Sequence, residues 1–239
     1  MALADVATER AHEQPAARVP ILENGDHLSR AEFERRYDAR PELKKAELIE
    51  GVVYVPSPVR IDVHGKPHGL IMGWLAIYTA GTPGVELADN ATVRLDLDNE
   101  PQPDALLRLD PAAGGRSRTS EDGYVEGPPE LLVEVAASSA SIDRHAKLRV
   151  YQRDGVEEYL IWQVLDGRLE WFVLREGVYE PLAPDERGVV HSRLFTGLRL
   201  AVPALLEGDL AAVLAEQQAA LGMPEHQAFV AALAARSLQ

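Results

Sequence analysis

The stretch Pro128–Tyr159, PPELLVEVAASSASIDRHAKLRVYQRDGVEEY, is the most informative part of this chain. Its apolar run predicts a buried strand that carries a single carboxylate, Glu134. A turn of small residues follows at Ala136–Ser141, and after it comes a helix rich in basic residues. A second strand begins near Glu157. This strand–turn–helix–strand unit predicts an α/β protein.

Glu134 is unusual because burying a charge is costly unless the charge is paired or bound to a metal ion. Asp104 follows Pro103 at the start of another predicted strand. If these two strands pair, the two carboxylates converge. With a strand carbonyl such as that of Val135, they would form a hard oxygen site that suits Mg²⁺ or Mn²⁺ better than zinc. Asp104 taken alone could equally well cap a turn.

Lys147 lies four residues after Asp143 in the predicted helix, and two interpretations stay open. The first is a surface ion pair worth only ~0.3–0.5 kcal/mol. The second is an ammonium group that points back to the carboxylates, and spacing alone favours the first. Glu47 and Glu50 could each supply a further carboxylate. Alternation along a strand places them on opposite faces, so only one of them can serve a given site.

The overall composition limits the function classes. The chain has 239 residues, no cysteine and a formal net charge of −14. Nucleic-acid binding would therefore need a local basic patch on an acidic body. The absence of cysteine fits a cytoplasmic protein without disulfides. No apolar run is long enough for a membrane span, and no phosphate-binding glycine motif predicts a nucleotide cofactor.

Two other groups of residues receive structural interpretations. His64 and His68 have metal-ligand spacing, but the glycine and proline between them argue against a regular helix, and zinc is not expected. Ser138, Ser139 and Ser141 lie outside any nucleophile-elbow motif, so we expect them to cap the following helix.

The rest of the chain predicts one α/β domain with a helical tail and no internal repeat. Ser29 and Glu32 have the form of a capping box. Glycine, proline and apolar periodicity predict the following elements: helices at 29–37 and 67–80, a hairpin at 47–55 turning at Gly51, strands at 85–97 and 103–109, an exposed mobile loop at 110–127, a hairpin at 160–174, short strands at 178–179 and 194–202, and helices at 205–221 and 227–238.

Taken in order, these segments resemble the Uma-type putative restriction endonuclease family of the PD-(D/E)XK nuclease superfamily. The resemblance spans roughly residues 29–174. The matching residues are Glu47-Leu48-Ile49-Glu50-Gly51, Ser57-Pro58 with His68, Pro103-Asp104, Pro129-Glu130-Leu131-Leu132-Val133-Glu134-Val135, Asp143, Lys147, Tyr151, Gly155-Val156 and Glu158-Tyr159.

The resemblance implies a restriction-endonuclease-like core, a mixed central sheet flanked by helices. With the composition of the two ends, we divide the chain into a flexible arm (1–24), the nuclease-like domain (25–202) and a C-terminal helical tail (203–239), and the tail gains no support from the resemblance. The resemblance also implies that Asp104 and Glu134 bind Mg²⁺ or Mn²⁺, that Lys147 is the catalytic lysine, and that Glu47 is an accessory acid with Glu50 as its alternate.

The sequence departs from the wider superfamily at one position. There the lysine follows two residues after the second carboxylate, where this chain has Ala136. The related family supplies its lysine from the next helix, and this favours the functional interpretation of Lys147. The turn Ala137-Ser138-Ser139-Ala140 also replaces the family's usual Ser-Pro-Ser-Thr.

The implied function is metal-dependent hydrolysis of phosphodiester bonds in DNA by an endonuclease, as a homodimer when both strands are cut. Arg144, Arg149 and Arg153 are candidates for holding the phosphate backbone, although they could equally form an ordinary solvated helix face. A rival interpretation keeps the fold but makes the protein an inactive binding or regulatory module. A third, an acyl or sugar hydrolase, lacks an aromatic platform for sugars.

Overall fold

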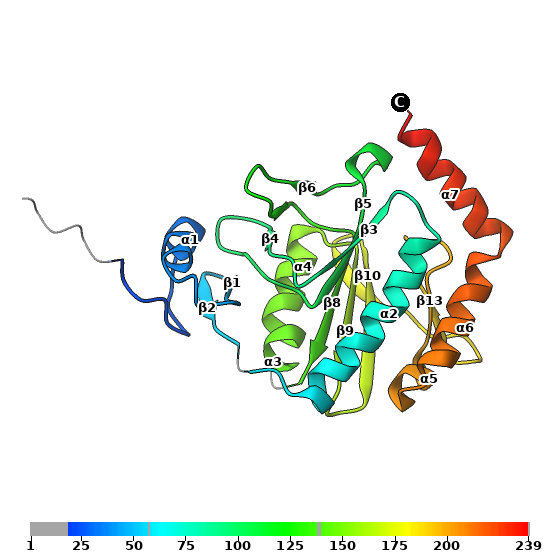
Figure 1. Ribbon diagram of the computed structural model, residues 1–239, viewed down its shortest axis with the longest axis horizontal. Helices are drawn as coiled ribbons and strands as arrows, with labels where there is room; N and C mark the ends of the chain where they lie inside the picture. The colour runs from blue at the N-terminus through cyan, green and yellow to red at the C-terminus, as the bar shows by residue number, and fades with distance from the viewer. Residues whose placement is uncertain (1–18, 57, 138–139, 239) are drawn as a thin grey trace, which may run out of the picture.

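The centre of the protein is a six-stranded mixed sheet with the order β11-β10-β9-β8-β5-β3 (Figure 1). The computed structural model describes residues 19–56, 58–137 and 140–238. The strands of this sheet are β3 (Val85–Asp89), β5 (Ala105–Leu109), β8 (Leu131–Ala136), β9 (Glu158–Gln163), β10 (Arg168–Arg175) and β11 (Val178–Pro181). The expected α/β architecture with helices around a mixed sheet is confirmed.

The two central strands, β8 and β9, are parallel, and every residue of both is buried. Such burial requires cover on both faces of the sheet. A helical crossover joins the two strands and covers one face. It consists of α3 (Ala140–Ile142), the π-helical turn η3 (Asp143–Lys147) and α4 (Leu148–Asp154). All other neighbouring strands of this sheet pair in antiparallel fashion.

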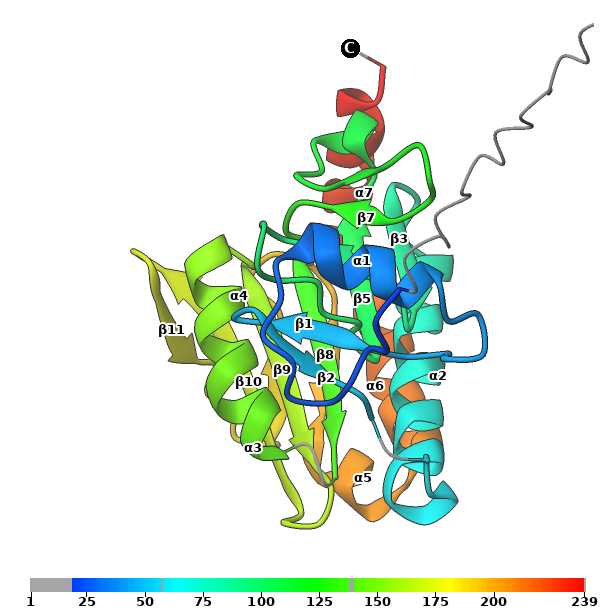
Figure 2. The same ribbon diagram turned by 90° about the vertical axis from the view of Figure 1, so that its left-hand side faces the viewer.

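Helices α2 and α6 cover the opposite face (Figure 2). The large apolar core on this side includes Trp74, whose ring packs edge-on against Trp171 at a centroid distance of 5.7 Å. Helix α7 packs against α6 in the same layer. The helices of this layer are α2 (Lys66–Ala80), α5 (Val202–Glu207), α6 (Leu210–Leu221) and α7 (Pro224–Arg236).

Residues 19–56 form a small amino-terminal lobe that adds no strand to the central sheet (Figure 2). It contains α1 (Arg30–Asp38) and the hairpin of β1 (Glu47–Ile49) and β2 (Val52–Tyr54). Glu50 and Gly51 both have positive φ, 51° and 74°, as a two-residue hairpin turn requires. The lobe has its own apolar cluster, and Leu48 exchanges two backbone hydrogen bonds with Glu100, of 2.8 and 3.1 Å.

Several local predictions need correction. Ser29 precedes α1, but its side chain makes no capping bond, and the Glu32 side chain pairs with Arg35 and Arg36 instead of closing the capping box. The strand expected at 85–97 breaks at Asn90, whose φ is 49°. Its second part is β4 (Val93–Arg94), which joins β6 (Arg118–Thr119) and β7 (Val125–Glu126) in a three-stranded sheet.

The region 110–127, expected to be an exposed mobile loop, is therefore ordered, and it begins with the 3₁₀ turn η2 (Pro111–Ala113). Backbone pairing with β4 explains its order. The segment 194–202 is a strand only at β13 (Arg199–Ala201), which pairs with β12 (Val189–His191). Ser138 and Ser139, expected to cap a helix, lie outside the described residues. None of the described helices is long and apolar enough to cross a membrane.

Candidate active site

Asp104 and Glu134 belong to neighbouring segments of the central sheet, where β5 and β8 pair in antiparallel fashion. Asp104 immediately precedes β5, and Glu134 is in the middle of β8, where Val133 pairs with Ala105. Oδ2 of Asp104 accepts a 2.7 Å hydrogen bond from the backbone N–H of Val135. The strand pairing and this bond place both buried carboxylates beside the same short piece of β8.

Lys147 points into the protein, toward the carboxylates. Its Nζ lies 2.8 Å from Oε1 of Glu47, 3.0 Å from Oε1 of Glu134 and 3.3 Å from Oδ1 of Asp143. The Lys147 side chain is only 4% exposed. The Asp143–Lys147 pair considered from the spacing thus exists, but it is buried rather than on the surface. We call Glu47, Glu134, Asp143 and Lys147 the inner cluster.

The π-helical turn η3 runs from Asp143 to Lys147 and holds both residues in buried positions. One wider turn of this kind inside a helix is a frequent feature of functional sites. Tyr151, one turn further along, donates a 2.9 Å hydrogen bond to Oε1 of Glu134. The hydroxyl of Tyr159 donates to the carbonyl of Asp143 at 2.9 Å. The crossover therefore supplies most of the partners of Glu134.

Glu47 reaches the inner cluster from the amino-terminal lobe. Its Oε1 accepts the backbone N–H of Gln102 at 2.7 Å in addition to its contact with Lys147. Glu50 occupies the hairpin turn, is exposed, and pairs with Arg149 at 2.8 Å. Of the two glutamates left open by the sequence, Glu47 is the one that lies against Lys147.

The inner cluster perturbs the acidities of its members. Burial raises the pKa of Glu134 well above its usual value, and the nearby carboxylates add to this effect against the opposing charge of Lys147. Burial would lower the pKa of Lys147, but Glu134, Glu47 and Asp143 outweigh it and raise that pKa well above the usual value. Lys147 therefore stays charged, and Glu134 is a weaker acid than an exposed glutamate.

Asp104 behaves in the opposite way. Burial alone would raise its pKa, but the hydrogen bond from His64, the charge of Lys45 and the bond from Val135 outweigh it. The result is a pKa of about 2. Asp104 is consequently an anion throughout the neutral range, even though its side chain is almost completely buried.

The donor chemistry fits a divalent cation. The carboxylates of the inner cluster and Asp104 are hard oxygen ligands of the kind that Mg²⁺ and Mn²⁺ prefer. Burial is the largest cause of the raised pKa of Glu134, and the charges of Asp143, Asp104 and Glu47 add to it. In the described part of the chain, no group of three or more His, Cys, Asp or Glu side chains stands ready to hold a metal ion. Lys147 itself lies among the carboxylates that would do so.

Three basic side chains near Asp104 were missed by the sequence reasoning. Lys45 Nζ and His64 Nε2 lie 3.5 and 3.3 Å from Oδ1 of Asp104. Nε2 of His68 lies 3.0 Å from the backbone carbonyl of the same residue. The four-residue spacing of the two histidines was the available signal. It was discounted because of Gly65 and Pro67.

The helix containing these histidines forms in spite of that glycine and proline. A π-helical turn, η1 (Ile61–Gly65), continues directly into α2. Pro67 lies in the first turn of α2, where the N–H that proline lacks would have no helical partner in any case. His64 and His68 consequently face the same residue, and their ring centroids are 5.8 Å apart.

Residues 30–203 match the model of the Uma2 family, which is described as "Putative restriction endonuclease". The chain belongs to this family. Among solved structures it is similar to a "putative nuclease belonging to DUF820" from Anabaena variabilis ATCC 29413. That similarity has a TM-score of 0.57 and 14% sequence identity, and covers 76% of this chain and 98% of that one. No curated protein matches. Family and fold together indicate a nuclease.

The Uma2 family match includes the three arginines predicted to hold DNA, and each of them faces an acidic side chain. Arg144 and Arg149 lie 3.1 and 2.8 Å from Glu170 and Glu50. Arg153 contacts both Asp96 and Asp154. Their charges are thus largely compensated in the free protein, and contact with phosphate would require them to exchange partners.

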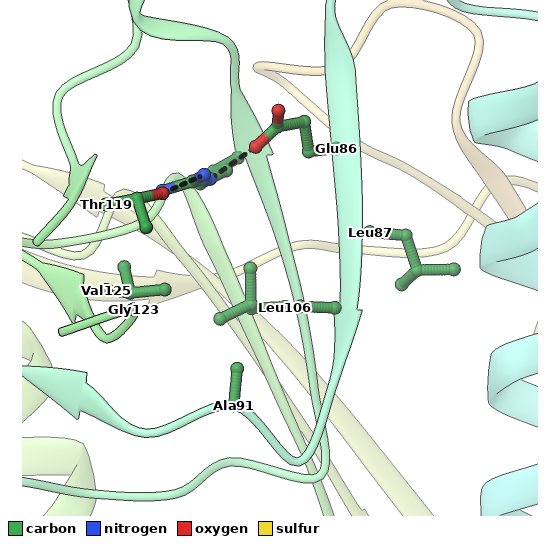
Figure 3. A pocket seen from close by; sticks show the side chains of 9 residues that line it. Glu86, Leu87, Ala91, Leu106, Thr119, Gly123 and Val125 are labelled. Carbon is green, nitrogen blue, oxygen red and sulfur yellow. Dashed lines mark hydrogen bonds and ion pairs between the residues drawn. The ribbon is translucent and has the colours of Figure 1, made fainter. Parts of the chain in front are cut away.

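A pocket of about 500 Å³ opens elsewhere in this Uma2 chain (Figure 3). Its rim includes Arg108, which bonds Glu86 at 2.6 Å and Thr119 at 2.8 Å, and Leu106 contributes to its apolar lining. None of the predicted site residues lines it. The inner cluster is therefore a packed group of polar side chains that does not line this pocket.

Proposed function

We propose that this chain is a divalent-metal-dependent endonuclease that hydrolyses phosphodiester bonds in DNA. The observation that carries the proposal is the position of Lys147. Its buried ammonium lies within 3.3 Å of three carboxylates, next to the strand that binds Asp104. An ionic array of this kind is costly to bury, and replacing it by apolar residues would often be neutral for stability. Its presence in a nuclease family supports a chemical role.

Asp104 and Glu134 would hold Mg²⁺ or Mn²⁺ in this proposal. The bound ion would supply Lewis-acid stabilisation of the phosphoryl oxygens and a water molecule of lowered pKa. Lys147 would orient the attacking water and stabilise negative charge on the phosphoryl group. Glu47 would position the ammonium of Lys147, which it contacts at 2.8 Å. Arg144, Arg149 and Arg153 would bind the backbone after leaving their acidic partners.

The test is cleavage of supercoiled plasmid DNA with Mg²⁺ or Mn²⁺. Wild type should nick the plasmid, and Asp104→Ala and Glu134→Ala should lose at least a factor of about 100, as expected when groups that stabilise the transition state are removed. Glu47→Gln and Glu50→Gln form a matched pair, and only the first should reduce the rate. Equal nicking by wild type and both alanine variants would reject the assignment.

A second candidate function is a binding or regulatory module without catalysis. Two observations favour it: Lys147 neutralises part of the inner cluster, and the described residues present no ready three-ligand site. Thermal unfolding with increasing Mg²⁺ or Mn²⁺ separates the two candidates, because a ligand of the folded state stabilises it by RT ln(1 + [L]/Kd). No shift at millimolar ion, together with no cleavage, would support the module.

Homodimer formation also belongs to this proposal, because two copies of the site could cut both strands. Helices α6 and α7, which lie outside the family match, are the surfaces we propose for it. Light scattering coupled to size exclusion would give the mass in solution. A monomer that still makes double-strand breaks would remove the dimer from the proposal and leave the chemistry intact.

A further inference from the structure

The basic side chains of the site fall into two groups that differ in accessibility. Lys147 is buried within the inner cluster. Lys45 and His64 contact Asp104, and their side chains are 26% and 22% exposed. We call Lys45 and His64 the outer pair. The outer pair is in contact with solvent, whereas Lys147 is almost completely buried.

The outer pair is loosely bound to Asp104. Both side chains approach the same oxygen, Oδ1, at 3.5 and 3.3 Å, which is longer than a typical charge-assisted hydrogen bond of 2.7–2.9 Å. The other oxygen of Asp104 is already bonded to the backbone of Val135. An ammonium group has three donors, and Lys45 directs one of them to Asn90 at 3.1 Å. Lys45 thus retains hydrogen-bonding capacity for an acceptor from solution.

His68 differs from the outer pair. Its Nε2 lies 3.0 Å from the carbonyl oxygen of Asp104 and 3.1 Å from Oδ1 of Asp89. Both neighbours are acceptors, so Nε2 carries the hydrogen and is used within the protein. His68 consequently fixes the backbone of Asp104, which leaves Lys45 and His64 as the groups that face outward.

The charges around Asp104 explain why an anion would need such a pair. The inner cluster and Asp104 together contain four carboxylates, whereas Lys147 and Lys45 supply two ammonium groups. With all of them ionised, the site carries a formal excess of two negative charges. A divalent cation would cancel that excess, but each phosphodiester brings a further negative charge. Cationic or hydrogen-bond-donating groups at the entrance would reduce this repulsion.

We propose that Lys45 and His64 bind the non-bridging oxygens of the DNA phosphate at the cleavage point. This inference rests on the proposed nuclease function and names the groups that hold its substrate. The three arginines of the crossover are weaker candidates for this contact. Each of them already pairs with an acidic side chain outside the inner cluster, whereas the carboxylate next to the outer pair is the one expected to bind the cation.

Lys44 offers a matched control for Lys45. It is adjacent in sequence and identical in charge, but it is exposed and donates to the carbonyl of Pro41 at 2.8 Å. The experiment measures binding of a fluorescent DNA duplex by anisotropy in Ca²⁺, which is used here as a probe that permits binding without rapid cleavage. Lys45→Gln should weaken binding roughly tenfold and reduce the slope of log Kd against log salt by about one, as loss of one phosphate contact predicts. Lys44→Gln should stay within about twofold of wild type.

Two further variants keep the inference falsifiable. Lys45→Arg retains the charge and should restore most of the binding, whereas a merely structural loss would persist. His64→Asn should raise KM for cleavage more than it lowers kcat. If wild type binds and cuts DNA and Lys45→Gln binds as Lys44→Gln does, the inference is wrong and the proposed function stands. If wild type neither binds nor cuts DNA, both fail.

Discussion

Two buried glutamates on neighbouring parallel strands show how different the same residue can be. Glu134 lies on β8 and Glu158 on β9, and both side chains are almost completely inaccessible. Glu134 contacts the cation Lys147 and the hydroxyl of Tyr151. Both of those partners come from the crossover on one face of the sheet.

Glu158 is instead surrounded by neutral donors. Its two oxygens accept hydrogen bonds from the side chains of Ser192 and Trp171 and from the backbone N–H groups of Arg193 and Leu194. These bonds fasten the segment after β12 to the sheet. Every oxygen of Glu158 is used by a fixed, local partner, so this glutamate has an obvious structural task.

This difference shows that burial alone does not identify a glutamate with a role in catalysis or metal binding. Burial raises the pKa of both residues, to about 7 for Glu158 against its four donors, and neighbouring carboxylates add to the increase for Glu134. What distinguishes Glu134 is that its partners, Lys147 and Tyr151, are ionisable and that Lys147 is shared with two further carboxylates, Glu47 and Asp143. The imbalance of charge in the inner cluster is what a bound cation would relieve.

Removing Lys147 should have the largest effect. Lys147→Met leaves three buried carboxylates without their cation, and breaking a buried ion pair from one side costs about 3–5 kcal/mol. Urea unfolding should show this loss, together with loss of any cleavage. Lys66→Met, at an exposed pair with Asp62, is the control and should change stability by less than about 1 kcal/mol. A loss below about 1 kcal/mol for Lys147→Met would show that the ion pair contributes little.

Glu158→Gln should lower the free energy of unfolding by about 1–3 kcal/mol. The reason is that the amide nitrogen of glutamine replaces one acceptor oxygen that faces four donors. Divalent-ion binding and cleavage should be retained, in contrast to Glu134→Gln. Chemical unfolding and plasmid nicking of the two variants test this contrast. Loss of cleavage in a folded Glu158→Gln protein would break the distinction between the two glutamates.

The difference in unfolding free energy between wild type and Glu158→Gln should depend on pH. The pKa of Glu158 rises from 4.5 to about 7 on folding, so the folded state binds the proton more tightly than the unfolded state does. Its contribution to stability is present below about pH 4.5 and is lost as the pH rises through about 7. The unfolding free energy of wild type should therefore fall relative to Glu158→Gln across this window. If urea unfolding gave the same free-energy difference between the two proteins at about pH 4.5 and at about pH 8, the raised pKa of Glu158 would be contradicted.

A divalent ion should stabilise wild type and Glu158→Gln alike. At an ion concentration ten times the Kd the expected gain is about 1.4 kcal/mol, and Glu134→Gln should lose most of it. Calorimetric unfolding at increasing Mn²⁺ would measure the three proteins side by side. An equal gain in all three would place the ion away from Glu134.

The smallest effect is expected at the surface of the crossover. Arg149→Gln removes an ion pair between two substantially exposed side chains, so its stability should change by at most about 1 kcal/mol. Thermal unfolding measures this, and a loss above about 2 kcal/mol would mean that Arg149 supports the fold. Together with Lys147→Met, this variant compares the stability lost on removing an exposed and a buried cationic side chain of the same crossover.

Local sequence rules drew attention to two carboxylates of the candidate site, whereas the roles of Lys147 and Glu47 were expected only from the family resemblance. A lone carboxylate in an apolar strand identified Glu134, and an adjacent strand start identified Asp104. Lys45 and His64 were not found because their approach to Asp104 depends on how the amino-terminal lobe and α2 pack against the sheet. The π-helical turns also escaped prediction, since no residue pattern specifies the extra residue in each turn.

The separateness of the amino-terminal lobe has a consequence for biosynthesis. Lys45 and Glu47 leave the ribosome early, but their partners Asp104 and Lys147 follow later, and Lys147 follows only after strand β8 has been made. Contacts between such distant positions form slowly, because a long loop must close first. A nascent or partly folded chain can therefore contain the lobe and its hairpin without an assembled site. Any cutting activity would be acquired at the end of folding, when the chain is complete.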